Sequence, residues 1–169
     1  MKNLIKAFAI LFVLTSCDDH KENSSVIPVK WDHRVAHYSP QDSLISGSTY
    51  LSVYSQIYSQ TEHRKHNLTA TVSMRNANRA DTIYIDEVDY FNTKGELRRS
   101  YFEKPIYIAP METVEIIIDE VVQEGGTGAN FLFDWKIKPN TIEPIFESVM
   151  ISTSGTQGLS FTTQGTRIK

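Results

Sequence analysis

FLFDWKIK, residues 131–138, is the stretch that decides the type of fold. Apolar side chains occupy positions 131, 133, 135 and 137, and charged side chains occupy positions 134, 136 and 138. A period of two puts the apolar residues on one face of a β-strand and the charged residues on the other. The stretch therefore predicts a sheet with one face on a core and the other in water, with Asp134 on the solvated face.

The same alternation recurs from Trp31 onward. It is clean in residues 68–75 and 114–119, and no stretch of ten or more residues keeps a helical apolar face. Further strands are predicted at residues 50–58, 82–91, 97–102, 106–108, 145–152 and 159–163, and one near 35–38. About eight to ten short strands separated by turns favour a single domain with an antiparallel, immunoglobulin-like β-sandwich. The Cys-Trp-Cys arrangement of antibody domains is absent, so the expected likeness is one of architecture.

Two local signals refine this prediction. Residues 92–95, Asn-Thr-Lys-Gly, lie between two strand-like runs, and their glycine can adopt a positive φ, which predicts a hairpin turn. The apolar face shifts by one residue between Ile85 and Val88. Such a shift predicts a β-bulge at residues 86–87.

The start of the chain reads as a lipoprotein signal peptide. Lys2 and Lys6 form its charged region, residues 7–14 are all apolar, and Leu14-Thr15-Ser16 precede Cys17. The apolar run is too short for a transmembrane helix, which needs roughly 20 residues. We expect cleavage before Cys17 and attachment of lipid (diacylglyceryl and palmitate) to its thiol. An ordinary cleavage that leaves a free thiol is the alternative.

This prediction divides the chain into three parts. Residues 1–16 are the cleaved peptide, 17–30 are a lipidated N-terminus with a flexible linker, and 31–169 are the β-sandwich domain. Loss of Lys2 and Lys6 moves the formal net charge from −3 to −5, which argues against nucleic acid as a partner. The single cysteine permits no internal disulfide. The expected location is the bacterial cell envelope, anchored to a membrane whose identity stays open.

Several segments, taken in order, resemble a bacterial family known as domain of unknown function 3124. They are residues 53–58, 73–76, 88–101, 125–131, 135, 144–151 and 157–161. The resemblance spans residues 49–166, and the glycine-rich block with the later Glu-containing strand is its most specific part. Ser152 and Gln164 depart from the family pattern, where glycine and a basic residue are expected, and this weakens a phosphate-binding role for the C-terminal loop. The family brings no established activity.

Residues 125–128, Gly-Gly-Thr-Gly, resemble a phosphate-binding loop in composition alone. A P-loop requires Lys-Ser/Thr after its last glycine and then a helix, whereas Ala129 and Asn130 lead into a predicted strand. We interpret the block as a mobile loop between strands with positive φ angles. A loop that grips a ligand, with Gly126 and Asn130 in contact, is the alternative.

The five histidines do not form a metal-binding pattern. His33 and His37 are predicted to share a strand face, and His63 and His66 to lie in a polar, basic loop. No third ligand falls at a suitable spacing for zinc. We therefore expect surface histidines and no metal or cofactor.

Carboxylates interrupt predicted apolar strands at Asp89, Asp134 and Glu147. Glu147 shares its parity with Ile145, Val149 and Ile151. If that face is the core, the carboxylate must be paired or its pKa raised. A structural ion pair, with Arg75 as one possible partner, is the favoured interpretation, and a catalytic acid is the alternative.

Tyr50, Tyr54 and Tyr58 share one face of a predicted strand. An exposed row of tyrosines would suit stacking on sugars or contact with a protein. The alternative is that the rings simply cover a sheet face.

The sequence thus leads to two functional hypotheses. The favoured one is a lipid-anchored, non-enzymatic module that binds a protein or glycan of the envelope or has a structural role there. The other is an envelope hydrolase or metal-dependent enzyme centred on Glu147 and residues 125–130. Convergence of those elements with Arg75 or Asp89 on one pocket would favour the enzyme.

Overall fold

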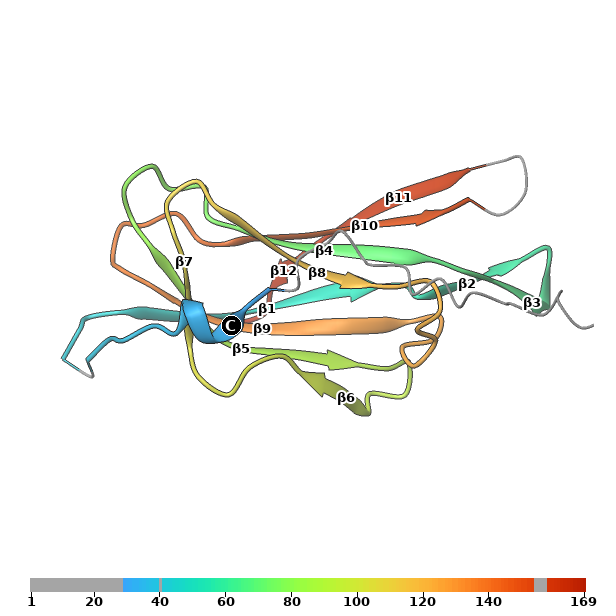
Figure 1. Ribbon diagram of the computed structural model, residues 1–169, viewed down its shortest axis with the longest axis horizontal. Coiled ribbons are helices and arrows are strands. Elements are labelled where there is room, and N and C mark those ends of the chain that lie inside the picture. Colours follow the sequence, from blue (N-terminus) through green and yellow to red (C-terminus); the bar gives the residue numbers. More distant parts are fainter. Residues whose placement is uncertain (1–28, 40, 154–157) are drawn as a thin grey trace, which may run out of the picture.

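The computed structural model describes residues 29–39, 41–153 and 158–169. Within them the chain forms two antiparallel sheets packed face to face, which confirms the predicted immunoglobulin-like β-sandwich (Figure 1). Cys17 and the predicted signal peptide lie outside the described residues. No helix in the described ranges is long and apolar enough to cross a bilayer.

The first sheet has the strand order β12-β1-β9-β5, and both β6 and β7 pair with the far edge of β5. Its strands are β1 (Ile45–Val53), β5 (Ile83–Phe91), β6 (Leu97–Ser100), β7 (Ile106–Ile108), β9 (Ala129–Ile137) and β12 (Thr166–Arg167). The second sheet has the order β11-β10-β4-β8. Its strands are β4 (Thr69–Arg75), β8 (Thr113–Ile118), β10 (Ile145–Ser152) and β11 (Leu159–Gln164).

A two-stranded ribbon, β2 (Gln56–Ser59) with β3 (Thr61–Asn67), joins the two layers. It continues β1 of the first sheet and leads directly into β4 of the second, and it extends to the right in Figure 1. The predicted strand at 50–58 is therefore broken between Val53 and Gln56. The predicted loop around His63 and His66 is wrong, because these residues belong to β3.

The core follows the alternation seen in the sequence. Every second residue of β9, from Ala129 to Ile137, is buried. Phe133 of β9 stacks on Phe146 of β10 with ring centroids 4.2 Å apart, so this pair joins the two sheets. Burial of a side chain of this size contributes about 1.5–3 kcal/mol to folding.

Both local signals of β5 are confirmed. The register with β9 shifts between Ile85 and Glu87, as expected for a bulge at residues 86–87. Gly95 has a φ of 75° in the turn between β5 and β6. The apolar face of β5 thus stays on the core on both sides of the bulge.

The predicted strand near residues 35–38 does not form. Trp31–Arg34 are a short 3-10 helix, η1, and Val35 makes one isolated bridge with Ile106. The segment crosses the outside of the sandwich and has no continuous partner strand. His33 and His37 therefore do not share a strand face.

Candidate functional site

Arg75 and Glu147 form an ion pair on the outer face of the second sheet. Arg75 Nε donates to Glu147 Oε1 at 2.5 Å, and its NH1 group donates to Thr113 Oγ1 at 3.1 Å. The predicted partner of Glu147 is thus found, but not in the core. Phe146 and Met150, of the opposite parity, are the β10 residues that fill the interior.

Glu147 lies on the solvent-exposed side of β10, so its negative charge does not have to be compensated as a buried charge would. The Glu147 side chain is 34% exposed, and its neighbours Ile145 and Val149 are 45% and 39% exposed. A half-exposed ion pair contributes only about 0–1 kcal/mol to stability. This geometry supports a structural role for the pair.

The glycine-rich loop is fastened to its neighbours. Thr93 donates to the Gly125 carbonyl oxygen from its backbone N at 3.1 Å and from Oγ1 at 3.0 Å. The Gly126 carbonyl oxygen accepts from Ser55 Oγ at 3.0 Å and from Gln56 N at 3.1 Å. Gly126 has a φ of 72°, as expected for glycine here. These bonds tie the loop to the β1–β2 junction and the β5–β6 turn, and the expected mobile loop is replaced by an anchored one.

Asn130 belongs to β9 rather than to this loop. Ala129 and Phe131 on either side of it are buried, so Asn130 faces outward from the first sheet. Glu147 faces outward from the second sheet. The two parts of the hypothetical enzyme site therefore lie on opposite faces of the sandwich and do not share a pocket.

The three tyrosines of the predicted row are separated by the break in their strand. Tyr50 on β1 is 39% exposed and Tyr58 on the ribbon is 57% exposed. Tyr54 lies between the strands and packs edge-on against Phe161, with ring centroids 5.8 Å apart. Tyr50 and Tyr58 are exposed, as the predicted row requires, but Tyr54 packs on Phe161 and the three rings do not form one continuous aromatic surface.

Acidic side chains gather on the outer face of the first sheet near the bulge. Repulsion from Asp89, with burial and the charges of Asp134 and Asp86, raises the pKa of Glu87. Asp86 is neutralised by Lys136, whose Nζ lies 2.6 Å from Asp86 Oδ2. In the described part of the chain, no group of three or more His, Cys, Asp or Glu is placed to hold a metal ion.

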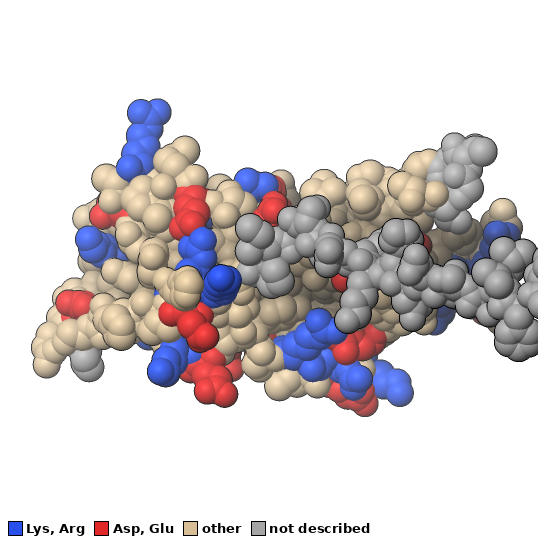
Figure 2. Space-filling model, in the orientation of Figure 1, with Lys and Arg blue, Asp and Glu red and all other residues tan. Residues whose placement is uncertain are grey.

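Charges of opposite sign are mixed on one face of the molecule. On the face shown in Figure 2, basic and acidic side chains are interspersed rather than separated into large patches. Several form ion pairs, among them Arg34 with Glu112 and Arg99 with Glu124. The part of this face that the described residues form therefore shows no broad basic area.

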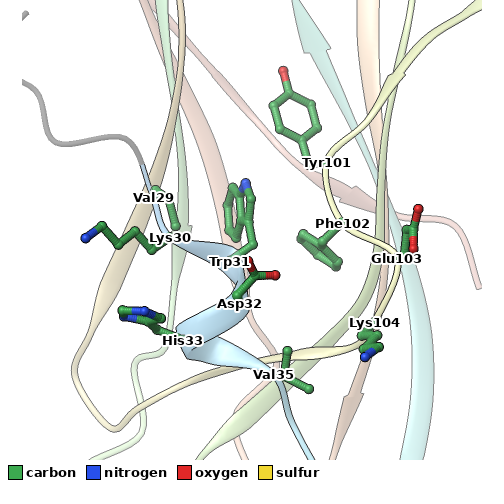
Figure 3. Close-up of a pocket in the computed structure, with 10 residues that line it drawn as sticks. All are labelled: Val29, Lys30, Trp31, Asp32, His33, Val35, Tyr101, Phe102, Glu103 and Lys104. Carbon is green, nitrogen blue, oxygen red and sulfur yellow. The ribbon is translucent and has the colours of Figure 1, made fainter.

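An open pocket lies between η1 and the segment that follows β6 (Figure 3). Its volume is about 760 Å³. The wall from η1 and its flanks and the wall from the β6–β7 connection face each other, and they contribute Val29, Lys30, Trp31, Asp32, His33, Val35, Tyr101, Phe102, Glu103 and Lys104. Sequence reasoning missed this pocket, because its two walls are about 70 residues apart in the chain and neither carries a motif.

Three half-buried aromatic rings line the pocket and hold one another in place. The Trp31 and Phe102 ring centroids are 5.2 Å apart, and those of Trp31 and Tyr101 are 6.4 Å apart in an edge-on arrangement. Tyr101 also packs on Phe131 of β9 at 5.7 Å, and burial raises the pKa of its hydroxyl to about 12. The aromatic wall is therefore continuous with the core.

The wall from η1 belongs to a longer segment, residues 29–38, which we call the N-terminal strap. Hydrogen bonds attach this strap to the sandwich. Arg34 NH2 donates to Glu112 Oε1 at 2.6 Å, and this hydrogen bond lowers the pKa of Glu112. Ala36 N donates to the Pro105 carbonyl oxygen at 2.7 Å, and the Tyr38 hydroxyl donates to Asp86 Oδ1 at 2.5 Å. The strap is therefore attached to the residue before β7, to the residue before β8 and to β5.

The two packed antiparallel sheets place the chain among all-β sandwich proteins. Residues 46–168 match the family described as "Protein of unknown function (DUF3124)", and the chain belongs to this family. The resemblance noted in the sequence is thereby confirmed. The Tyr101–Lys104 wall of the pocket lies inside the matched residues, and η1 lies before them.

One solved structure with detectable similarity is described as "Crystal Structure of Thermotoga maritima 1070". It is 8% identical in sequence and has a TM-score of 0.46, and the match covers 71% of this chain and 92% of that one. No curated protein matches the chain.

Proposed function

We propose that this chain is an envelope lipoprotein, anchored to a membrane through lipid on Cys17, whose β-sandwich binds a partner without catalysing a reaction. The proposed anchor is supported by the charged, apolar and small-residue pattern that ends at Cys17. The expected partner is a protein or glycan of the envelope.

The observation that carries the binding role is the open aromatic pocket beside the N-terminal strap. Ligand sites combine apolar and aromatic surface with a few polar groups, and they occupy about 300–1,000 Å³. The pocket volume falls within this range, its aromatic rings are held by contacts with each other and with the core, and half of its ten lining residues are charged or polar. Rings held in this way lose little freedom on binding, which favours affinity.

An envelope hydrolase or metal-dependent enzyme centred on Glu147 and residues 125–130 is the second candidate. It has less support, because Glu147 is paired with Arg75 and Asn130 lies on the opposite face of the sandwich. The carbonyl oxygens of Gly125 and Gly126 are already used in hydrogen bonds within the domain.

The anchor is tested by fractionating cells that express the full chain or its Cys17→Ser variant. We expect the wild-type protein in the membrane pellet and the variant in the soluble fraction. A Cys17→Ser protein that stays in the pellet contradicts the anchor.

The binding role is tested by affinity capture from envelope extracts with the lipidated chain as bait. A partner retained by the wild type and by Ile151→Ala, but lost with Trp31→Ala, supports the pocket as the site. Ile151 is the control because it is an exposed apolar residue on β10, away from the pocket. Equal capture by all three baits would show that the pocket is not the binding site.

A further inference from the structure

The polar side chains at the rim of the aromatic pocket, four of them charged and one a histidine, have no partners within the described residues. Lys30, Asp32, His33, Glu103 and Lys104 are all exposed, and none takes part in an ion pair or a side-chain hydrogen bond there. On the other side of η1, by contrast, Arg34 is held by Glu112 at 2.6 Å. The rim therefore presents donors and acceptors that are free to meet a ligand.

The signs of these charges balance. Lys30 and Lys104 contribute two positive charges, and Asp32 and Glu103 contribute two negative charges. A site for phosphate, nucleic acid or an acidic peptide needs an excess of one sign to attract its ligand. A balanced rim instead suits a neutral ligand that both accepts and donates many hydrogen bonds.

The aromatic rings add a second requirement. The faces of aromatic rings carry partial negative charge, so they attract C–H groups with partial positive charge as well as apolar surface. A ligand that fits both the rings of Trp31 and Phe102 and the rim must have an apolar C–H face bordered by hydroxyl groups. Pyranose rings have this combination.

The backbone around the pocket argues against an extended peptide added as a strand. Strand addition needs a free sheet edge with unpaired N–H and C=O groups. Neither η1 nor the segment Tyr101–Lys104 is a strand, and the β7 edge beside η1 is covered by the Val35–Ile106 bridge and the bond from Ala36 to Pro105. The outer edge of β6, which pairs with no other strand among the described residues, ends before the Tyr101–Lys104 wall, so strand addition is excluded at the walls of the pocket and not at β6.

We infer that the aromatic pocket is a binding site for a neutral glycan, with sugar rings stacked on Trp31 and Phe102. Asp32 and Glu103 accept hydrogen bonds from sugar hydroxyls, and Lys30 and Lys104 donate to sugar oxygens. Because the pocket is open, it takes part of a longer saccharide chain. This assignment of ligand class rests on the proposed binding function.

The test is titration of the full chain with four neutral hexasaccharides, namely cellohexaose, chitohexaose, maltohexaose and mannohexaose, followed by tryptophan emission and by calorimetry. Trp31 lines the pocket, whereas Trp135, the other tryptophan, is 1% exposed in the core. A saturable change in emission therefore reports binding at Trp31. In Trp31→Phe the emission change should disappear while calorimetry still detects binding.

Variants of the two kinds of contact should separate ring stacking from hydrogen bonding. Trp31→Ala should weaken binding at least tenfold, and Asp32→Asn should weaken it several-fold. Asp32 is exposed on η1, so its substitution leaves the core intact. Ile151→Ala and Asp119→Asn, which change an exposed apolar side chain and an exposed carboxylate elsewhere, should bind as the wild type does.

Absence of saturable binding to all four hexasaccharides overturns the glycan assignment, as does binding that Trp31→Ala leaves unchanged. If the hexasaccharides fail while capture of an envelope protein still requires Trp31, the ligand class is wrong and the proposed binding function stands. If capture fails as well, both are wrong.

Discussion

Gly47 of β1 should resist even a single added methyl group. A Cβ built at this position comes within 2.7 Å of three carbon atoms of the Trp135 indole ring. The ring has little room to move, because it is buried and its Nε1 donates to Thr49 Oγ1 at 2.9 Å. Gly47→Ala must therefore displace either the ring or the strand.

The cost can be worked out from these contacts. Overpacking a core costs about 1–3 kcal/mol, and loss of the bond to Thr49 adds about 1 kcal/mol. Replacement of glycine by alanine also restricts the unfolded chain, which offsets about 0.4–1 kcal/mol. We expect the free energy of unfolding to fall by about 1–3.6 kcal/mol, which for a chain of this size lowers Tm by about 2–14 °C.

Urea unfolding of the full chain, followed by far-UV circular dichroism, measures this change. Gly128→Ala is the matched control, since its Cβ would meet Thr93 Cγ2 only at 3.4 Å, and its stability should stay within about 0.5 kcal/mol of the wild type. Trp135→Phe should cost less in the Gly47→Ala background than alone, because the smaller ring relieves the overlap. A Gly47→Ala protein as stable as the wild type would refute the reasoning.

Three further changes test other parts of the structure. Phe133→Ala removes one ring of the stack between the two sheets and should cost about 3–5 kcal/mol in urea unfolding; a cost below 1 kcal/mol would contradict its place in the core. Thr93→Val removes the hydroxyl that bonds to Gly125 and Gly128, and should cost about 1–2 kcal/mol and speed hydrogen exchange at the Gly128 amide; unchanged exchange would argue against the anchored loop. The folded-state pKa of Glu112 is lowered, so its ion pair with Arg34 stabilises the strap above the usual glutamate pKa of about 4.5 and loses this effect as the pH falls through the folded value. Exchange at the Ala36 amide, corrected for the intrinsic rate, should therefore rise on acidification in the wild type and depend less on pH in Arg34→Ala, and identical profiles would exclude the ion pair as the cause.

Much of the fold could be predicted because the apolar period is unambiguous where only one face of a strand is buried. Ile106–Ile108 and Ile145–Ser152 have the predicted bounds, and the bulge at residues 86–87 follows from a visible change of phase. In each case the strand bounds or the bulge follow from which side chains are apolar and therefore buried, and this can be read from the sequence residue by residue.

The failures occur where that signal is weak or applies to both faces. The ribbon strand Thr61–Asn67 is polar throughout and is defined by pairing with β2, so it has no apolar period to read. On β10 both parities carry large apolar residues, and Phe146 and Met150, not Ile145 and Val149, fill the space between the sheets. Which of the two faces of β10 is buried depends on the side on which the other sheet packs, and the sequence of β10 alone does not show this.

The candidate site shows the same limit more strongly. Trp31 and Phe102 become neighbours because Val35 bridges to Ile106 and Arg34 reaches Glu112, which are single contacts without a sequence pattern. A pair of distant aromatic residues in a β-protein is by default a pair of core residues.

The N-terminal strap has a mechanical consequence for a domain held by its N-terminus. A pull on the chain ahead of Val29 loads the strap first, and the strap is fastened by one bridge and a few separate bonds rather than by a continuous ladder. Such bonds break one after another under tension, whereas strands within the sheets must break many at once. If the domain is anchored as proposed, tension on that anchor would peel Trp31 away from Phe102 while the sandwich stays folded, and the shape of the aromatic pocket would then differ between a slack and a taut anchor.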